Sequence, residues 1–196
     1  MSPKYKALGN GTLDNEVTFL RPTQNLPDTV TMDNPARDVM TDLTSVTAMS
    51  VNPCANIDQV GERMVSSEVH LLLVTNQFLD VIGIITSNDL SGSKALKYIK
   101  ETGGNREDIM VRDLMTPQHK IEVLDLEDVK KSKVGDLVET LKHMGRRHAL
   151  VIGRDEKGSQ IICGLLSTAQ IGKQLGMEIS TADVASSIAD LASSKE

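Results

Sequence analysis

The chain has 196 residues, a formal net charge of −6 and an isoelectric point near 5.3. An acidic chain with two Tyr, two Phe and no Trp offers neither the basic face nor the stacking rings that nucleic acids require. It also lacks a run of about twenty apolar residues that would cross a membrane, and its first residues lack the apolar segment of a signal peptide. We therefore expect a cytoplasmic protein that binds no nucleic acid and inserts into no membrane.

Residues 1–34 read as an N-terminal extension. They are polar, contain several Pro and Gly residues, and carry one apolar run that ends in Phe19 and Leu20. This composition predicts an extended arm. If the arm lies over the rest of the protein, Phe19 and Leu20 are its expected anchor.

The segment 35–103 alternates short strands with helices. The first strand is expected around Val46 and Thr47. The elements expected after it are, in order, a helix over 56–67, strands over 70–76 and 81–86, and a helix over 87–100. Gly103 and Gly104 then read as a helix stop and a linker.

The segment 104–176 repeats the pattern of the first. The recurring pairs of stretches begin at Ala36 and Val111, at His70 and His148, and at Gly83 and Gly164, with offsets of 75 (111 − 36), 78 (148 − 70) and 81 (164 − 83). Three matches in the same order, separated by small insertions, indicate two copies of one β-α-β-β-α unit.

The stretch from Gly83 to Asp89 is the candidate binding motif. Ile84 and Thr86 share one face of the expected strand, and the turn of helix that follows brings Asp89 back beside Thr86. An apolar surface, a hydroxyl and a carboxylate suit a nucleoside, whose base packs and whose ribose hydroxyls donate to the carboxylate. Thr86 and the free N–H groups of the helix would meet phosphate. The same Thr-x-x-Asp pattern is also a variant capping box, which serves the helix alone.

The Asp-Val-Met-Thr opening, the amphipathic helix before an apolar strand, and the close in Thr-x-x-Asp together resemble the cystathionine β-synthase (CBS) domain. Two such units in tandem over residues 35–176 resemble the Bateman module, a regulatory unit that binds adenosine-type ligands. The resemblance implies an α/β (α+β) fold in which CBS domain 1 (35–103) and CBS domain 2 (104–176) pack about a pseudo-twofold axis. It also implies a homodimer of modules. Residues 177–196 form a C-terminal tail with a candidate helix.

The resemblance further implies two clefts, each with a Thr/Asp corner from one copy and basic residues from the other. Arg147 and His148 occupy the positions of a phosphate-contacting basic pair in the regulatory subunit of AMP-activated kinase. The expected nucleotide site therefore consists of Asp89, Thr86, Ile84, Arg147 and His148, with Val46 and Thr47 as candidate lining.

The other cleft is the weaker candidate. Ser167 and Gln170 replace the threonine and the aspartate, and Glu68 stands where the second copy has Arg146. Glutamine lacks the charge to accept from both ribose hydroxyls, and Glu68 would repel phosphate. A capping box alone does not explain this joint loss, because glutamine serves a capping box as well as aspartate. We expect this cleft to be vacant or to take an uncharged ligand.

The leading hypothesis is a stand-alone regulatory protein that binds AMP, ADP or ATP between the repeats and signals to a partner protein. The alternatives are a sensor of S-adenosylmethionine or NADH, and a dimerisation or interaction module that binds no nucleotide. An enzyme is disfavoured, because the sequence has no phosphate loop and no readable nucleophile–base pair. The histidines lack metal-ligand spacing, and Cys54 and Cys163 stand far apart, so we expect reduced thiols, no metal site and no required cofactor.

Overall fold

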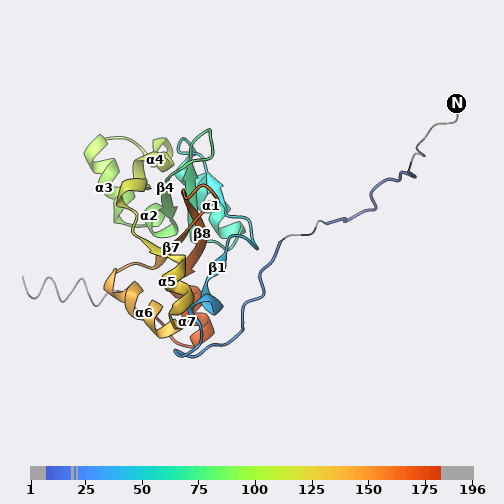
Figure 1. The fold of residues 1–196 in the computed structure, drawn as a ribbon. Helices are drawn as coiled ribbons and strands as arrows, with labels where there is room; N and C mark the ends of the chain where they lie inside the picture. The colour runs from blue at the N-terminus through green and yellow to red at the C-terminus, as the bar shows by residue number, and fades with distance from the viewer. Residues whose placement is uncertain (1–7, 19, 21, 182–196) are drawn as a thin grey trace, which may run out of the picture.

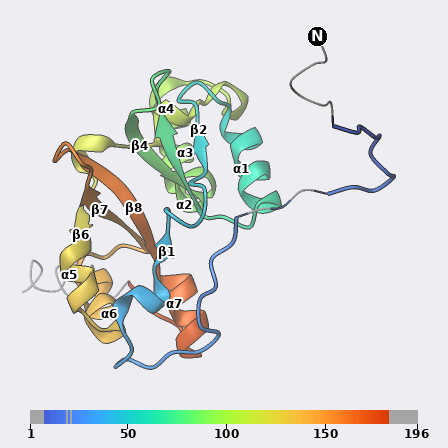
Figure 2. The ribbon, with the colours of Figure 1, turned by 45° about the vertical axis from the view of Figure 1, so that its right-hand side comes forward.

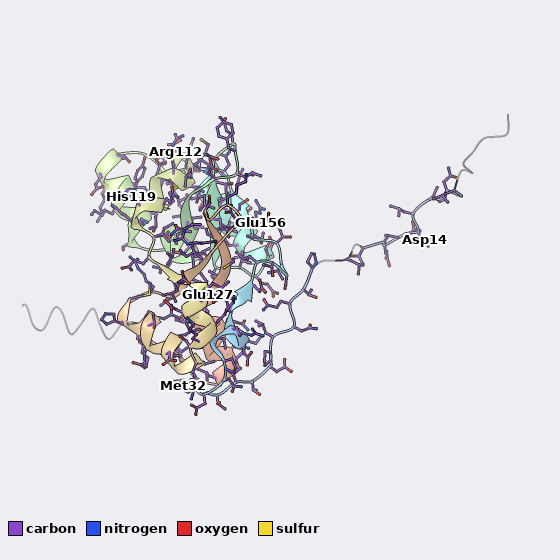
Figure 3. The ribbon with its side chains drawn as sticks, viewed as in Figure 1. Asp14, Met32, Arg112, His119, Glu127 and Glu156 are labelled. Carbon is purple, nitrogen blue, oxygen red and sulfur yellow. The ribbon has the colours of Figure 1, made fainter. Side chains whose placement is uncertain are left out.

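The computed structural model describes residues 8–18, 20 and 22–181. Its folded part consists of two four-stranded sheets with helices packed on their outer sides (Figure 1). The described arm runs past α7 and β1 (Figure 2). Its earlier part, which includes Asp14, extends away from the folded part (Figure 3).

Both sheets mix parallel and antiparallel strands. The sheet with the order β1-β8-β7-β6 consists of Thr41–Asp42, Gln160–Ser167, His148–Arg154 and Val123–Asp125. The sheet with the order β2-β3-β4-β5 consists of Ser50–Val51, Leu71–Thr75, Val81–Thr86 and Thr116–Pro117. The expected strands over 70–76 and 81–86 are confirmed as the hairpin β3–β4, and β7–β8 is its counterpart in the second repeat.

Each sheet takes one outer strand from the other repeat. β1 pairs with β8 and places Thr41 opposite Leu165, whereas β5 pairs with β4 and places Thr116 opposite Ile84. Thr41 and Thr116 are equivalent positions in the two copies, so the exchange obeys the pseudo-twofold relation of the repeats. The segment that opens each repeat therefore lies against the sheet of the other repeat.

The helices form where the sequence supplies an apolar face and a cap. The α-helices are α1 (Ile57–Ser66), α2 (Ser87–Ser91), α3 (Ser93–Thr102), α4 (Val111–Leu114), α5 (Leu126–Lys131), α6 (Val134–His143) and α7 (Thr168–Leu175). The short 3-10 helices are η1 (Ala36–Val39), η2 (Arg106–Asp108) and η3 (Gln118–Lys120). Asn56 caps α1 by accepting hydrogen bonds from the Asp58 and Gln59 amides, and the helix buries the expected apolar face.

Two expected elements differ from the structure. The single helix expected over 87–100 is broken at Gly92, where the backbone is extended and passes so close to the Asn88 carbonyl that a Cβ would lie 2.5 Å from its oxygen. The strand expected at Val46 and Thr47 is also wrong. These two residues belong to the connection between β1 and β2, and the strand forms later, at Ser50–Val51, where it pairs with β3.

The core has three parts. One apolar cluster packs under each sheet, around Val138 and Leu166 in one half and around Ile57 and Ile85 in the other. A third, smaller cluster of Leu71, Leu73 and Leu150 lies between β3 of one sheet and β7 of the other. The two repeats are thus joined by packed leucines along their pseudo-twofold axis.

The N-terminal arm is not anchored where the sequence suggested. Leu20 is 99% exposed, and Phe19 lies outside the described residues, as do 182–196 with the candidate tail helix. The arm is instead fastened by Val30, which is buried in the core and whose amide donates to the Gln174 carbonyl. Gln174 is itself buried, and its side-chain amide donates to the carbonyls of Pro27 and Asp38.

No helix among the residues that the structure describes is long and apolar enough to span a membrane.

Candidate functional site

A cleft of about 280 Å³ lies between the end of β4 and the connection from α6 to β7. We call it the first cleft. Its volume is near the lower end of the range for small-molecule sites. The exchange of outer strands builds it, because β5 pairs with β4 and the segment after β5 leads from there back to the sheet of the second repeat. Its main polar lining residues are Thr86, Asp89, Lys120, Arg146, Arg147 and His148.

The corner formed by Thr86 and Asp89 has the expected geometry. Asp89 Oδ2 accepts hydrogen bonds from the Thr86 hydroxyl at 2.8 Å and from the Thr86 amide at 2.9 Å, which makes a capping box for α2. Asp89 Oδ1 accepts from Lys94 Nζ at 2.9 Å. Ile84 lines the same cleft. The apolar residue, the hydroxyl and the carboxylate therefore lie together in the cleft, and the capping box and the Lys94 ion pair use different oxygens of Asp89.

Cationic side chains face this corner from the other repeat. Arg147 lines the cleft and has no ion-pair partner within the described part of the chain, whereas Arg146 lies 3.9 Å from Glu122. Lys120, on the segment after β5, also lines the cleft and was missed from the sequence. The sequence feature that could have identified Lys120 is its place just after the opening segment of the second repeat. That place predicts the first cleft only if the exchange of outer strands is already known.

His148 is in the cleft but does not act as a cation. Burial, together with the neighbouring charges of His70 and Arg147, lowers the pKa of His148 to about 4. At neutral pH this side chain is therefore an uncharged imidazole, which can still donate or accept a hydrogen bond. The positive charge of the cleft comes from the arginines and the lysine.

Val46 and Thr47 do not line the first cleft, which corrects their expected place. They line the other cleft, because β1 pairs with β8 and the segment after β1 leads from there back to the sheet of the first repeat. The equivalent residues of the second repeat, Ile121 and Glu122, take their place in the first cleft. The expected set had paired the corner of the first repeat with the opening segment of the same repeat.

The second cleft is larger, about 650 Å³, and is lined by Ser167 and Gln170 as expected. Here the corner is open: Ser167 makes no side-chain cap on α7, and the Gln170 amide donates to the Gln174 side chain at 3.1 Å. Glu68 and Lys173 bring one negative and one positive charge. Pro22 of the arm also reaches this cleft. The two clefts thus differ in charge and in the state of their corner.

Neither a protein-family model nor a curated protein matches this sequence. Solved structures do match its fold. The CBS-domain containing protein ATU1752 from Agrobacterium tumefaciens is 20% identical over 76% of this chain and 98% of its own, with a TM-score of 0.52. An uncharacterized conserved protein from Pyrococcus horikoshii is 20% identical over 72% of this chain and 92% of its own, with a TM-score of 0.50.

A third match is the CBS domain pair of protein MJ0100, whose structure was solved in complex with 5′-methylthioadenosine and S-adenosyl-L-methionine. It is 14% identical over 74% of this chain and 97% of its own, with a TM-score of 0.50. At these identities the likeness concerns the fold, and it agrees with the two sheets and the internal repeat described above. The chain therefore has the fold of a tandem pair of CBS domains.

Proposed function

We propose that this protein is a regulatory CBS-pair protein that binds an adenine nucleotide of the AMP, ADP or ATP type in the first cleft. The observation that carries this proposal is the meeting of the Thr86–Asp89 corner with Arg147 and Lys120 across one cleft. The carboxylate suits ribose hydroxyls, and the guanidinium and ammonium groups suit phosphate oxygens. A fold neighbour that was solved with two adenosine compounds supports the choice of ligand class.

The asymmetry of the clefts supports a single nucleotide site. The first cleft combines a carboxylate corner with three cations, of which Arg146 pairs with Glu122. The second has Gln170 at the corner and one lysine together with Glu68. A phosphorylated nucleoside gains charge-assisted hydrogen bonds in the first cleft and meets like charge at Glu68 in the second. Regulation follows from binding in this proposal: the chain performs no reaction, and occupancy of the first cleft is passed to a partner protein.

Titration calorimetry with AMP, ADP, ATP, S-adenosylmethionine and NADH tests the proposal and orders the ligands. A ligand present at 100 times its dissociation constant should also stabilise the protein by about 2.7 kcal/mol in a thermal-shift assay. Asp89→Ala and Arg147→Ala should abolish the shift, and Gln170→Ala should leave it intact. Each variant is compared with its own ligand-free melting temperature, because Asp89→Ala also removes a helix cap.

The ligand panel also separates the alternatives. If the protein responds to S-adenosylmethionine or NADH and to none of AMP, ADP and ATP, the ligand is that compound and the proposal of an AMP, ADP or ATP site is wrong. A flat response to all five compounds would favour an interaction module without a ligand.

We also infer that two modules pair as a homodimer. Val65 on α1 and Leu96 on α3 are large apolar side chains on exposed helix faces of the first repeat, and each is a candidate for a contact between modules. Light scattering coupled to gel filtration tests the pairing, and a monomer at all concentrations would exclude it. Val65→Glu should shift a dimer toward monomer, whereas the matched change Ser66→Glu on the same helix should not.

A further inference from the structure

The chain turns back sharply where α7 ends. Gly176 adopts a left-handed conformation with φ of 68°, and the Met177 amide donates to the Gly172 carbonyl at 3.0 Å. The return path runs so close to the helix that a Cβ on Gly172 would lie 2.6 Å from the Met177 oxygen. We call residues 176–181 the C-terminal strap. Its course depends on glycine at positions 172 and 176.

The strap is seated by one buried side chain. Ile179 is 8% exposed and packs in the core cluster that also contains Ile171 and Val30. Two residues later, Thr181 lines the first cleft, whose lining also includes Arg147. The strap therefore leads from the last helix of the second repeat to the cleft that contains the Asp89 corner.

The first repeat has no equivalent of the strap. With the offset of 81, Gly172 corresponds to Ser91 and Gly176 corresponds to Ala95. In the first repeat the chain continues from α2 into α3 instead of turning back. Among the described strap residues, Thr181 lines the first cleft, and none lines the second. The strap thus reaches the first cleft through its last described residue.

We propose that Thr181 is a specificity-determining residue of the first cleft and that the strap closes on a phosphorylated ligand. This inference rests on the proposed nucleotide site. A threonine hydroxyl donates to a phosphate oxygen, and its place beside Arg147 puts both donors on the same part of the ligand. When Ile179 is packed in the core, Thr181 is held at the cleft, where it can contact the ligand. Ligand binding therefore stabilises the packed position of the strap, and that position strengthens ligand binding by the same factor.

Calorimetry with AMP and with adenosine tests the role of Thr181. Thr181→Val keeps the shape of the side chain and removes the hydroxyl, so AMP affinity should fall about tenfold while adenosine affinity stays unchanged. Gly172→Ala should weaken AMP binding in the same direction, because the added methyl displaces the strap. The matched control is Thr102→Val, on the exposed end of α3, which should bind AMP like the unaltered protein.

Hydrogen exchange at the Met177 amide gives a second readout that needs no variant of the cleft. AMP should slow this exchange in the unaltered protein, and Gly172→Ala should accelerate it without ligand. An unaltered protein that binds neither AMP nor any other adenylate would overturn the nucleotide site and the strap proposal together. AMP binding that is equal in the unaltered protein, Thr181→Val and Gly172→Ala would overturn the strap proposal alone.

Discussion

Lys94 Nζ lies 2.9 Å from Asp89 Oδ1, the carboxylate oxygen of this corner that takes no part in the capping box. Lys94 is on the first turn of α3, just beyond the break at Gly92, so the kink between α2 and α3 brings its ammonium group back to the corner. A ribose that donates to Asp89 Oδ1 must share this oxygen with Lys94 or displace it. In the proposed site, the residue that would compete with a ribose thus lies five positions after the carboxylate.

The first prediction follows from this competition. Lys94→Met should raise the affinity for adenosine about two- to fivefold, because an ion pair as exposed as this one contributes about 0.2–1 kcal/mol. Adenosine is the right probe, since an uncharged ligand does not lose attraction to the lysine itself. Lys97→Met is the control, because Lys97 pairs with Glu101 on the exposed side of α3. Equal adenosine affinity in Lys94→Met and the unaltered protein would exclude the competition.

The second prediction concerns pH. The pKa of His148 is lowered to about 4 in the folded protein, mainly by burial, against about 6.5 in the unfolded chain. Folding therefore favours the neutral form of His148. The contribution of this neutral side chain to the free energy of unfolding is complete above pH 6.5 and is lost as the pH falls toward 4. Its full size is at most about 3 kcal/mol in the free energy of unfolding.

Urea unfolding at pH 7.0 and pH 4.5 measures this loss. The decrease in unfolding free energy between the two pH values should be smaller in His148→Gln than in the unaltered protein. His143→Gln is the matched control, because His143 is exposed at the end of α6 and should leave the decrease unchanged. The same decrease in all three proteins would contradict the assignment to His148.

The internal repeat predicted most of the fold, because each apolar strand and each amphipathic helix recurs at a nearly constant offset. The offsets do not tell whether an outer strand joins the sheet of its own repeat or the sheet of the other repeat. Thr41 and Thr116 occupy equivalent positions in both cases. For this reason Val46 and Thr47 were assigned to the wrong cleft, and Lys120 was missed. The pairing is decided by packing between the repeats, which a local pattern does not contain.

The corner residues were predictable for a different reason. The geometry that joins Thr86 to Asp89 spans three positions along the chain, so the spacing itself determines it. The uncharged state of His148 was not predictable, because it depends mainly on burial in the folded protein, with smaller contributions from His70 and Arg147. The sequence therefore predicts contacts between residues close in the chain, but it does not predict the charge state of a residue that depends on the folded cleft.

The third prediction concerns the arm. Gln174→Leu removes both donors that satisfy the carbonyls of Pro27 and Asp38, and it should lower the free energy of unfolding by about 1–3 kcal/mol. Exchange at the Val30 amide, which donates to the Gln174 carbonyl, should accelerate more than exchange in α1. Gln170→Ala is the control, since it removes a single hydrogen bond to Gln174 and should cost less than the leucine variant. Equal stability of Gln174→Leu and the unaltered protein would show that the arm is not fastened by this amide.

The last prediction compares the two hairpin turns. In the β3–β4 turn, Asn76 Oδ1 accepts from the amides of Phe78 and Asp80. In the β7–β8 turn, Asp155 Oδ1 accepts in the same way from Lys157 and Ser159. The two turns are related by an offset of 79, the difference between residues 155 and 76.

The left-handed position of these turns is Leu79 (φ 68°) in one repeat and Gly158 (φ 79°) in the other. A left-handed leucine costs about 1–2 kcal/mol, and its side chain is 78% exposed, so packing returns little of this. Leu79→Gly should therefore stabilise the protein by about 0.5–1 kcal/mol, after the entropy that glycine adds to the unfolded chain is subtracted. Gly158→Leu should destabilise it by about 0.5–1 kcal/mol, because the lost entropy of glycine in the unfolded chain offsets part of the strain. Urea unfolding of both variants is the measurement, and a Leu79→Gly variant less stable than the unaltered protein would mean that the exposed leucine makes a contact that offsets its strain.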